Sequence, residues 1–192
     1  MLPLLLASSS SYRRELLSRL RLPFACASPD IDESRLRDES ADALVRRLAG
    51  LKAQALAKDY PGHLIIGSDQ VAVLGERIIG KPHSFDKACE QLLAASGASV
   101  TFLTGLALLN TDSGHCQVDV VPFRVQMREL DLPRIERYLH AEQPYDCAGS
   151  FKAEGLGVSL FQSTSGPDAT SLIGLPLIRL VDMLMAEGVA IP

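Results

Sequence analysis

Three short polar clusters adjoin apolar runs of this sequence, and they contain the residue types that could carry chemistry. They are residues 8–14 (SSSSYRR) after LPLLLA, residues 67–70 (GSDQ) after HLII, and residues 149–155 (GSFKAEG) before LGVSLF. In α/β folds, ligands bind where strands pass into loops or helices. Hydroxyls, guanidinium groups, a carboxylate and an amine together suit a polyphosphate with a metal ion.

Arg13 and Arg14 follow four serines at the predicted start of a helix. Arginine recognises phosphate through planar, bidentate pairs, and serine hydroxyls with the backbone amides of a helix N-terminus form an anion site. Neighbouring helical residues point about 100° apart, so the two guanidinium groups need not face one ligand. Residue types alone leave two interpretations open, a phosphate site and a solvated first turn with serine caps.

Two acidic positions are candidates for binding a metal ion or orienting a water molecule. Asp69 follows an apolar run and is predicted at a strand end, where a carboxylate can do either. We favour this role over a turn-capping aspartate, because Gly67 keeps the approach open. Glu33 lies beside Asp32 in a charged stretch over residues 29–40, where solvated charge is the ordinary interpretation.

Four further charged residues are weaker candidates. Lys81 stands between a glycine and a proline and could place its amine rigidly near a phosphate, whereas Lys52 lies in a predicted helix, where a surface lysine is the default. Lys152 and Glu154 alternate, so in a strand they would share a face. Their flanking glycines favour a tight loop near a ligand, with a surface ion pair as the alternative.

Several nucleotide-binding and hydrolase motifs are absent from the sequence. It contains no G-x-x-x-x-G-K-[ST] loop, no G-x-G-x-x-G turn and no G-x-S-x-G elbow. Its four cysteines and four histidines form no C-x-x-C or H-x-x-x-H pair. Neither a zinc site nor a disulfide framework is therefore predicted, and reduced thiols in the cytoplasm fit best. The residues alone indicate a cleft for a phosphorylated ligand, with a metal ion assisting.

Length and composition predict a single domain over residues 1–192. A chain of 192 residues buries roughly 70% of its unfolded surface, so its core needs no disulfide or metal. The net charge of −4 disfavours a nucleic-acid partner. The N-terminal MLPLLLA is too short to span a membrane and has no basic residue before it, so no membrane association is expected.

Hydrophobic periodicity predicts alternating helices and strands around a central hairpin. The predicted helices cover residues 12–20, 41–60, 84–96, 132–142 and 176–188. The predicted strands cover residues 2–7, 24–28, 64–68 with a continuation or bend over 70–74, 77–80, 100–109, 117–127 and 155–161, and residues 163–168 are expected to be a loop. This order favours a mixed twisted α/β sheet flanked by helices, with two lobes around a ligand cleft.

At these same residues the chain resembles the Maf family of nucleotide pyrophosphatases. LLLASSSSYRRELL is similar to the family's opening motif, DIDES to its acidic loop and LAGLKAQALA to its lysine-bearing helix. IIGSDQVAVLGERIIGKP is similar to its central block, and SGASVTFLTGLAL to its Ser-Gly and Thr-Gly strand. The resemblance implies an architecture like that of inosine triphosphatases, a divalent cation (Mg²⁺ or Mn²⁺) and a homodimer. It also implies hydrolysis of a nucleoside triphosphate between the α- and β-phosphates.

The resemblance also implies roles for individual residues. Asp69 would be the proton acceptor, and with Glu33 it would hold the metal ion or water. Lys52 and Lys81 would complete the catalytic set. The residues implied to bind the triphosphate are Ser8, Arg13 and Arg14.

Three positions concern the choice of base. Family members that act on thymidine and uridine triphosphates have Thr at position 70 and Gln at position 154, whereas this chain has Gln70 and Glu154. It therefore resembles the subgroup that hydrolyses 7-methyl-GTP. Glu154 could accept hydrogen bonds from N1–H and the exocyclic amine of the cationic base, and Tyr12 could stack on it. The subgroup often has Trp at position 12.

Two alternatives remain at this point. One is a nucleotide-binding regulator of septum formation without catalysis, for which a carboxylate placed for water would not be needed. The other is a pyrophosphatase for a different triphosphate, either a pyrimidine nucleotide or a deaminated purine nucleotide such as ITP.

Overall fold

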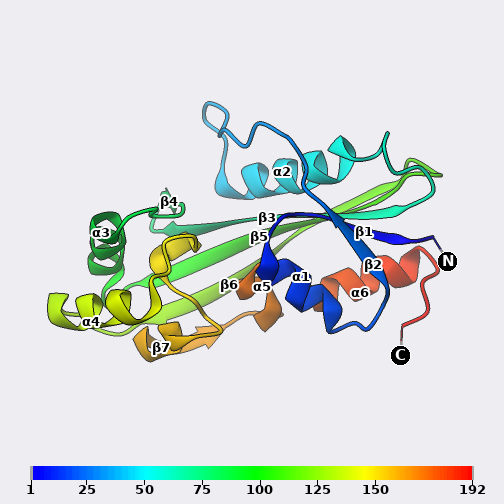
Figure 1. Cartoon of the computed structure of the whole chain (residues 1–192). Coiled ribbons are helices and arrows are strands. Elements are labelled where there is room, and N and C mark those ends of the chain that lie inside the picture. Colours follow the sequence, from blue (N-terminus) through cyan, green and yellow to red (C-terminus); the bar gives the residue numbers. More distant parts are fainter. Residues whose placement is uncertain (1, 192) are drawn as a thin grey trace.

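A mixed sheet of seven strands forms the centre of the computed structural model, which describes residues 2–191 (Figure 1). The strands are β1 (Leu4–Ala7), β2 (Phe24–Ala27), β3 (Leu64–Leu74), β4 (Arg77–Ile79), β5 (Ser99–Asn110), β6 (Cys116–Met127) and β7 (Phe161–Ser165). The helices are α1 (Ser11–Ser18), α2 (Ala41–Ala55), α3 (Phe85–Ala95), α4 (Leu132–Glu142), α5 (Ala169–Ile173) and α6 (Leu177–Ala186), with 3₁₀ turns η1 (Ala148–Ser150) and η2 (Leu156–Leu160). The strand order is β2-β1-β3-β5-β6-β7, and β4 pairs with β3.

The strand pairing leaves a gap of four residues along one edge of β3. β5 pairs with β3 along its whole length on the other edge. On the gapped edge, β1 runs parallel to β3 and ends at the pair Ala7–Gly67, whereas β4 joins only from Ala72 onward. Residues 68–71, here called the edge gap, therefore lie between the ends of β1 and β4.

Helix α2 covers one face of the sheet at unusually close range. A Cβ atom on Gly67 would lie 2.1 Å from the carbonyl oxygen of Ala49, and one on Gly105 would lie 2.1 Å from that of Val45. Any side chain at these two positions would push the helix away from β3 and β5. Figure 1 shows α2 alone on this face, with α1, α5 and α6 on the opposite one.

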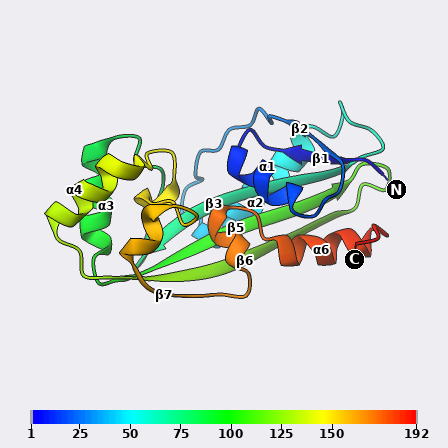
Figure 2. The ribbon, with the colours of Figure 1, turned by 60° about the horizontal axis from the view of Figure 1, so that its bottom comes forward.

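Two groups of helices build separate apolar cores at the two ends of the sheet. Helices α3 and α4 enclose a cluster that contains Leu92, Phe102 and Leu139, whereas α1 and α6 enclose one that contains Leu17 and Leu184. Figure 2 shows α3, α4 and β7 at one end, and α1, α6, β1 and β2 at the other. The two predicted lobes correspond to these ends. Among the residues described, no helix is both long and apolar enough to cross a membrane.

Most predicted elements are confirmed. The β5–β6 hairpin, α3, α4 and α6 begin and end within a few residues of the prediction, and side chains cap α1, α2, α3 and α4. Ser10, for example, accepts a hydrogen bond from the backbone N–H of Arg13. The mixed α/β sheet is likewise confirmed.

Five details of the prediction are wrong. Leu156–Leu160 form the turn η2 rather than a strand, and Gly157 in this turn packs closely against the backbone of Lys152. Strand β7 follows at Phe161–Ser165, in part where a loop was expected, and the short helix α5 was not predicted. Helix α2 ends at Ala55 instead of residue 60. Strand β3 runs unbroken to Leu74, which confirms the predicted continuation, so the placement of Asp69 at a strand end is wrong and Asp69 lies in mid-strand.

Candidate active site

A cavity of about 690 Å³ opens at the edge gap. Its walls come from the end of β1, the first turn of α1, helix α2, the region of residues 146–154, and the end of α5. A volume of this order accommodates a nucleotide-sized ligand. Because side chains alternate along a strand, Asp69 in the edge gap points toward α2, whereas its neighbours Ser68 and Gln70 point toward α5.

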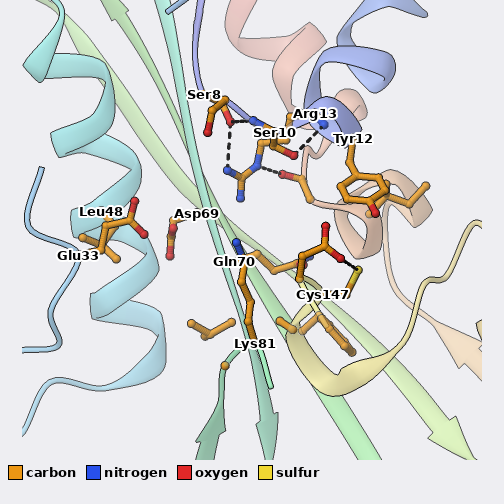
Figure 3. Close-up of a pocket in the computed structure, with 18 of the residues that line it drawn as sticks. Ser8, Ser10, Tyr12, Arg13, Glu33, Leu48, Asp69, Gln70, Lys81 and Cys147 are labelled. Carbon is orange, nitrogen blue, oxygen red and sulfur yellow. Dashed lines mark hydrogen bonds between the residues drawn. The ribbon is translucent and has the colours of Figure 1, made fainter. Parts of the chain in front are cut away.

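One wall of the cavity holds a guanidinium group in a fixed orientation. The Arg13 Nε donates a hydrogen bond to the carbonyl oxygen of Gly174 at 2.8 Å, and its Nη1 lies 3.5 Å from Ser8 Oγ. Ser8 Oγ also accepts from the backbone N–H of Ser10 at 3.1 Å. Burial lowers the pKa of Arg13, and the nearby carboxylates of Asp69 and Glu33 oppose this. A fixed guanidinium beside a helix N-terminus suits a phosphate group (Figure 3).

The opposite wall holds two carboxylates joined by one ammonium group. Lys52 Nζ lies 2.7 Å from Asp69 Oδ1 and 3.0 Å from Glu33 Oε1. The side chains of Lys52 and Asp69 are 7% and 11% exposed, whereas that of Glu33 is 57% exposed. Gly67 explains how the pair forms, because it brings the turn of α2 that contains Lys52 onto β3. The default expectation of a surface lysine at position 52 is therefore wrong.

The carboxylates of Asp69 and Glu33 are the candidate ligands for a divalent cation. Within residues 2–191, no group of three or more His, Cys, Asp and Glu side chains could hold a metal ion. Asp69 and Glu33 nevertheless both contact Lys52 Nζ, which places them close to one another. Mg²⁺ commonly takes one or two carboxylates and completes its shell with water and substrate phosphates. The residues present fit that mode of binding.

Gln70 is held by the protein through its amide nitrogen. Gln70 Nε2 donates to the carbonyl oxygens of Ser171 at 2.7 Å and Leu172 at 3.2 Å, and it lies 3.0 Å from Thr104 Oγ1. The Thr104 hydroxyl itself donates to the Ser171 carbonyl at 2.8 Å. A ligand would therefore meet Gln70 through Oε1, which is a hydrogen-bond acceptor.

A fourth group of side chains lies across the cavity from Asp69. The Tyr12 ring faces Lys152, whose Nζ is 5.9 Å from the ring centroid. Burial raises the pKa of Tyr12, and it raises that of Cys147 to about 12, where the nearby Asp146 carboxylate adds to the effect. The raised pKa favours the protonated thiol of Cys147 at neutral pH, a form that is a poor nucleophile. Figure 3 shows Tyr12 and Cys147 on this side, and Asp69 with Glu33 on the other.

The structure brings most of the predicted site residues to this cavity. The predicted residues that line it are Ser8, Tyr12, Arg13, Glu33, Lys52, Asp69, Gln70, Lys81 and Glu154. Arg14 is exposed and is not part of the lining, because consecutive residues of α1 point in different directions. Lys152 and Glu154 lie in a turn and not in a strand, which agrees with the tight loop favoured for them, and Glu154 lines the cavity.

Sequence reasoning missed the contribution of α5 and of Gly174, which caps the C-terminus of this helix. The carbonyl oxygen of Gly174 accepts from Arg13 and from Ser68 Oγ at 3.0 Å. Asp146 and Cys147 also line the cavity without having been assigned roles. Backbone carbonyls have no motif of their own, and the only available signal was the Asp168 that caps α5 by accepting from Thr170 N–H.

Fold and site together define an α/β protein with a cleft suited to a phosphorylated ligand. The chain belongs to the family described as Maf-like proteins, whose model matches residues 3–187. A protein of Pseudomonas fluorescens strain Pf0-1 named 7-methyl-GTP pyrophosphatase is 81% identical over 192 residues, which is 100% of both chains. One of the same name from Pseudomonas aeruginosa PAO1 is 70% identical over 189 residues, which is 98% of each.

Two solved structures share the fold at low sequence identity. The HAM1 protein of Coxiella burnetii aligns with a TM-score of 0.54 and 16% identity, covering 97% of this chain and 100% of its own. The Staphylococcus aureus Ham1 protein aligns with a TM-score of 0.56 and 13% identity, covering 96% and 99%. At this identity the likeness concerns the fold alone.

Proposed function

We propose that this protein is a nucleoside triphosphate pyrophosphatase that hydrolyses 7-methyl-GTP to 7-methyl-GMP and diphosphate. The observation that carries the proposal is the Lys52–Asp69 pair facing the fixed Arg13 guanidinium across one cavity. This arrangement supports the proposal, because a carboxylate suited to orienting a water molecule lies opposite groups suited to binding phosphate. The choice of 7-methyl-GTP as the substrate is inferred from the full-length relatives named 7-methyl-GTP pyrophosphatase.

The phosphate chain is held by the groups of the first wall. Arg13 pairs with phosphate oxygens through its terminal nitrogens, since its Nε is committed to Gly174. The Ser8 hydroxyl and the exposed amine of Lys81 complete the binding groups along the cavity. A triphosphate carries roughly four negative charges and the reaction adds charge to the departing diphosphate, so these cations stabilise the transition state more than the ground state.

The chemical step uses the second wall. Lys52 holds Asp69 Oδ1, which leaves Oδ2 to accept a proton from the attacking water. The resulting hydroxide bonds to the α-phosphorus as the bond from that phosphorus to the bridging oxygen breaks. The electron pair leaves with diphosphate. Asp69 and Glu33 would hold Mg²⁺ or Mn²⁺, which would neutralise charge on the phosphates when bound.

The base is recognised on the side of the cavity opposite Asp69. Glu154 accepts from N1–H and the exocyclic amine of 7-methylguanine, and Gln70 Oε1 offers a further acceptor. The Tyr12 ring stacks on the cationic base. Uracil and thymine place acceptors on either side of one N–H donor, so an anionic Glu154 matches them poorly.

The first experiment is to incubate the purified protein with Mg²⁺ or Mn²⁺ and 7-methyl-GTP, GTP, UTP, dTTP or ITP, and to measure diphosphate release. Preference for 7-methyl-GTP supports the proposal. Preference for another triphosphate keeps the mechanism and overturns the assignment of Glu154 and Tyr12. Light scattering on the same sample tests the homodimer that the family resemblance implies, and fractionation of cells tests a cytoplasmic location.

Asp69→Asn separates an enzyme from a nucleotide-binding regulator. We expect hydrolysis to fall by at least about 100-fold, the contribution of a positioned general base, while nucleotide affinity persists. Arg14→Ala is the matched control, because Arg14 is exposed outside the cavity. Full activity in the Asp69→Asn protein would overturn the role of Asp69, and a cellular effect that survives it would favour the regulator.

A further inference from the structure

The turn that carries Glu154 is fastened at both ends to one helix. At its start, the backbone N–H of Lys152 donates to the Tyr138 hydroxyl oxygen at 3.0 Å. At its end, the backbone N–H of Leu156 donates to Glu142 Oε2 at 2.7 Å. Tyr138 and Glu142 are four residues apart in α4, so they project from the same side of that helix.

Glu142 makes a second contact to the same turn. Its Oε1 lies 3.7 Å from Lys152 Nζ, and the side chains of Glu142 and Lys152 are 17% and 26% exposed. Lys152 Nζ is the group that faces the Tyr12 ring. One carboxylate is thus connected both to the turn that presents Glu154 and to the cation beside Tyr12.

The position of Glu142 differs from that of the residues already assigned. It is not among the residues that line the cavity, whereas Glu154 and Tyr12 are. A hydrogen bond from a backbone amide to a carboxylate is charge-assisted and strong, and the low exposure of Glu142 limits competition from water. Its contacts fix the place from which Glu154 reaches the cavity.

We infer that Glu142 is a positioning residue for base recognition, acting together with Tyr138 to hold residues 152–156 so that Glu154 and Tyr12 meet the base in one geometry. This inference rests on the proposed function, because it concerns the selectivity of that same cavity. Without the Glu142 contact, Glu154 samples several positions and Lys152 is released from its place beside Tyr12. Selectivity between 7-methyl-GTP and GTP then decreases, since the two differ only at the base.

The test compares Glu142→Ala, Glu142→Gln and the control Glu136→Gln. Glu136 lies in the same helix and has the same charge, and among the described residues no hydrogen bond or ion pair involves its side chain. The first readout is amide hydrogen exchange at Leu156 by NMR without nucleotide. The second is the ratio of kcat/KM for 7-methyl-GTP to kcat/KM for GTP, with kcat and KM determined separately.

Glu142→Ala should raise exchange at Leu156 and lower the selectivity ratio, each by about tenfold, as expected for one charge-assisted hydrogen bond. The loss should appear in KM for 7-methyl-GTP. Glu142→Gln should fall between the wild type and Glu142→Ala, because its amide oxygen can still accept from Leu156 N–H, and it serves as the test if the alanine variant does not fold. Glu136→Gln should change neither readout.

Two results would overturn the inference. Unchanged exchange at Leu156 would show that Glu142 does not hold the turn, and faster exchange with an unchanged ratio would show that the contact only supports the fold. If the wild type hydrolyses neither nucleotide, the proposed function fails. The ratio of dissociation constants for 7-methyl-GTP and GTP then replaces the kinetic ratio, with the same tenfold expectation and the same refutation.

Discussion

Replacing Lys52 with Met removes the only ammonium group that joins Asp69 and Glu33 among the described contacts. The contact to Asp69 is 2.7 Å long and both side chains are nearly buried, so its loss leaves a charge with little solvent around it. Breaking a buried pair from one side costs about 3–5 kcal/mol. Glu33 is mostly exposed, and its pair adds only about 0–1 kcal/mol.

For a chain of this length, about 3–5 kcal/mol corresponds to a fall in Tm of about 6–20 °C. Calorimetry or thermal denaturation followed by circular dichroism would measure it. The double variant Lys52→Met with Asp69→Asn removes the stranded charge as well, so it should recover most of the lost stability. A single variant that costs less than about 1 kcal/mol, or a double variant no more stable than the single one, would refute this reasoning.

Three further predictions concern acid stability, helix packing and thiol reactivity. Hydrogen bonds from Arg47 lower the pKa of Glu39 to about 2 from 4.5, so this pair stabilises the fold above pH 4.5 and loses its effect as the pH falls toward 2. The urea midpoint of Glu39→Gln should therefore lie below that of the wild type at pH 7, and the two midpoints should converge in acid. A difference between the midpoints that does not change with pH would contradict this. Gly67→Ala should lower the free energy of unfolding by about 1–3 kcal/mol or more, because the new methyl group meets the Ala49 carbonyl. An unfolding free energy equal to that of the wild type in urea would show that α2 does not lie as close to β3 as described. At pH 7.5 iodoacetamide should alkylate Cys147 at least about 100-fold more slowly than free cysteine, because burial raises the pKa of Cys147 to about 12. Mass spectrometry of tryptic peptides measures this rate, and a rate near that of free cysteine would contradict the burial of the thiol.

Periodicity was sufficient to predict most of the fold because most elements have an apolar face of the expected period. Helix α4 matches its prediction from Leu132 to Glu142, since Asp131 caps it and its apolar residues recur at helical spacing. The apolar run LGVSLF misled the prediction over residues 155–161. Leu156–Leu160 of this run instead form η2, where Leu156 N–H donates to Glu142 of α4, a tertiary contact that no local pattern records.

The site was less predictable from residue types than the fold was. A lysine within a helix is ordinarily solvated, and only the close approach of α2 to Gly67 and Gly105 places Lys52 against Asp69. Arg14 illustrates the opposite error, because adjacent arginines in one motif differ in direction by the helical rotation. The carbonyl of Gly174, which orients Arg13, is a backbone group and leaves no trace in composition.

The short length of the edge gap limits which molecules can bind along this edge of β3. An uncovered strand edge commonly invites another polypeptide strand and so promotes aggregation. On this edge of β3 only residues 68–71 lack a neighbouring strand, and the ends of β1 and β4 enclose them on both sides. Four residues span roughly 13 Å of strand, which is too short for another polypeptide strand to pair along it. This recess is therefore a poor site for an added polypeptide strand, whereas its cavity of about 690 Å³ has room for a ligand the size of a mononucleotide.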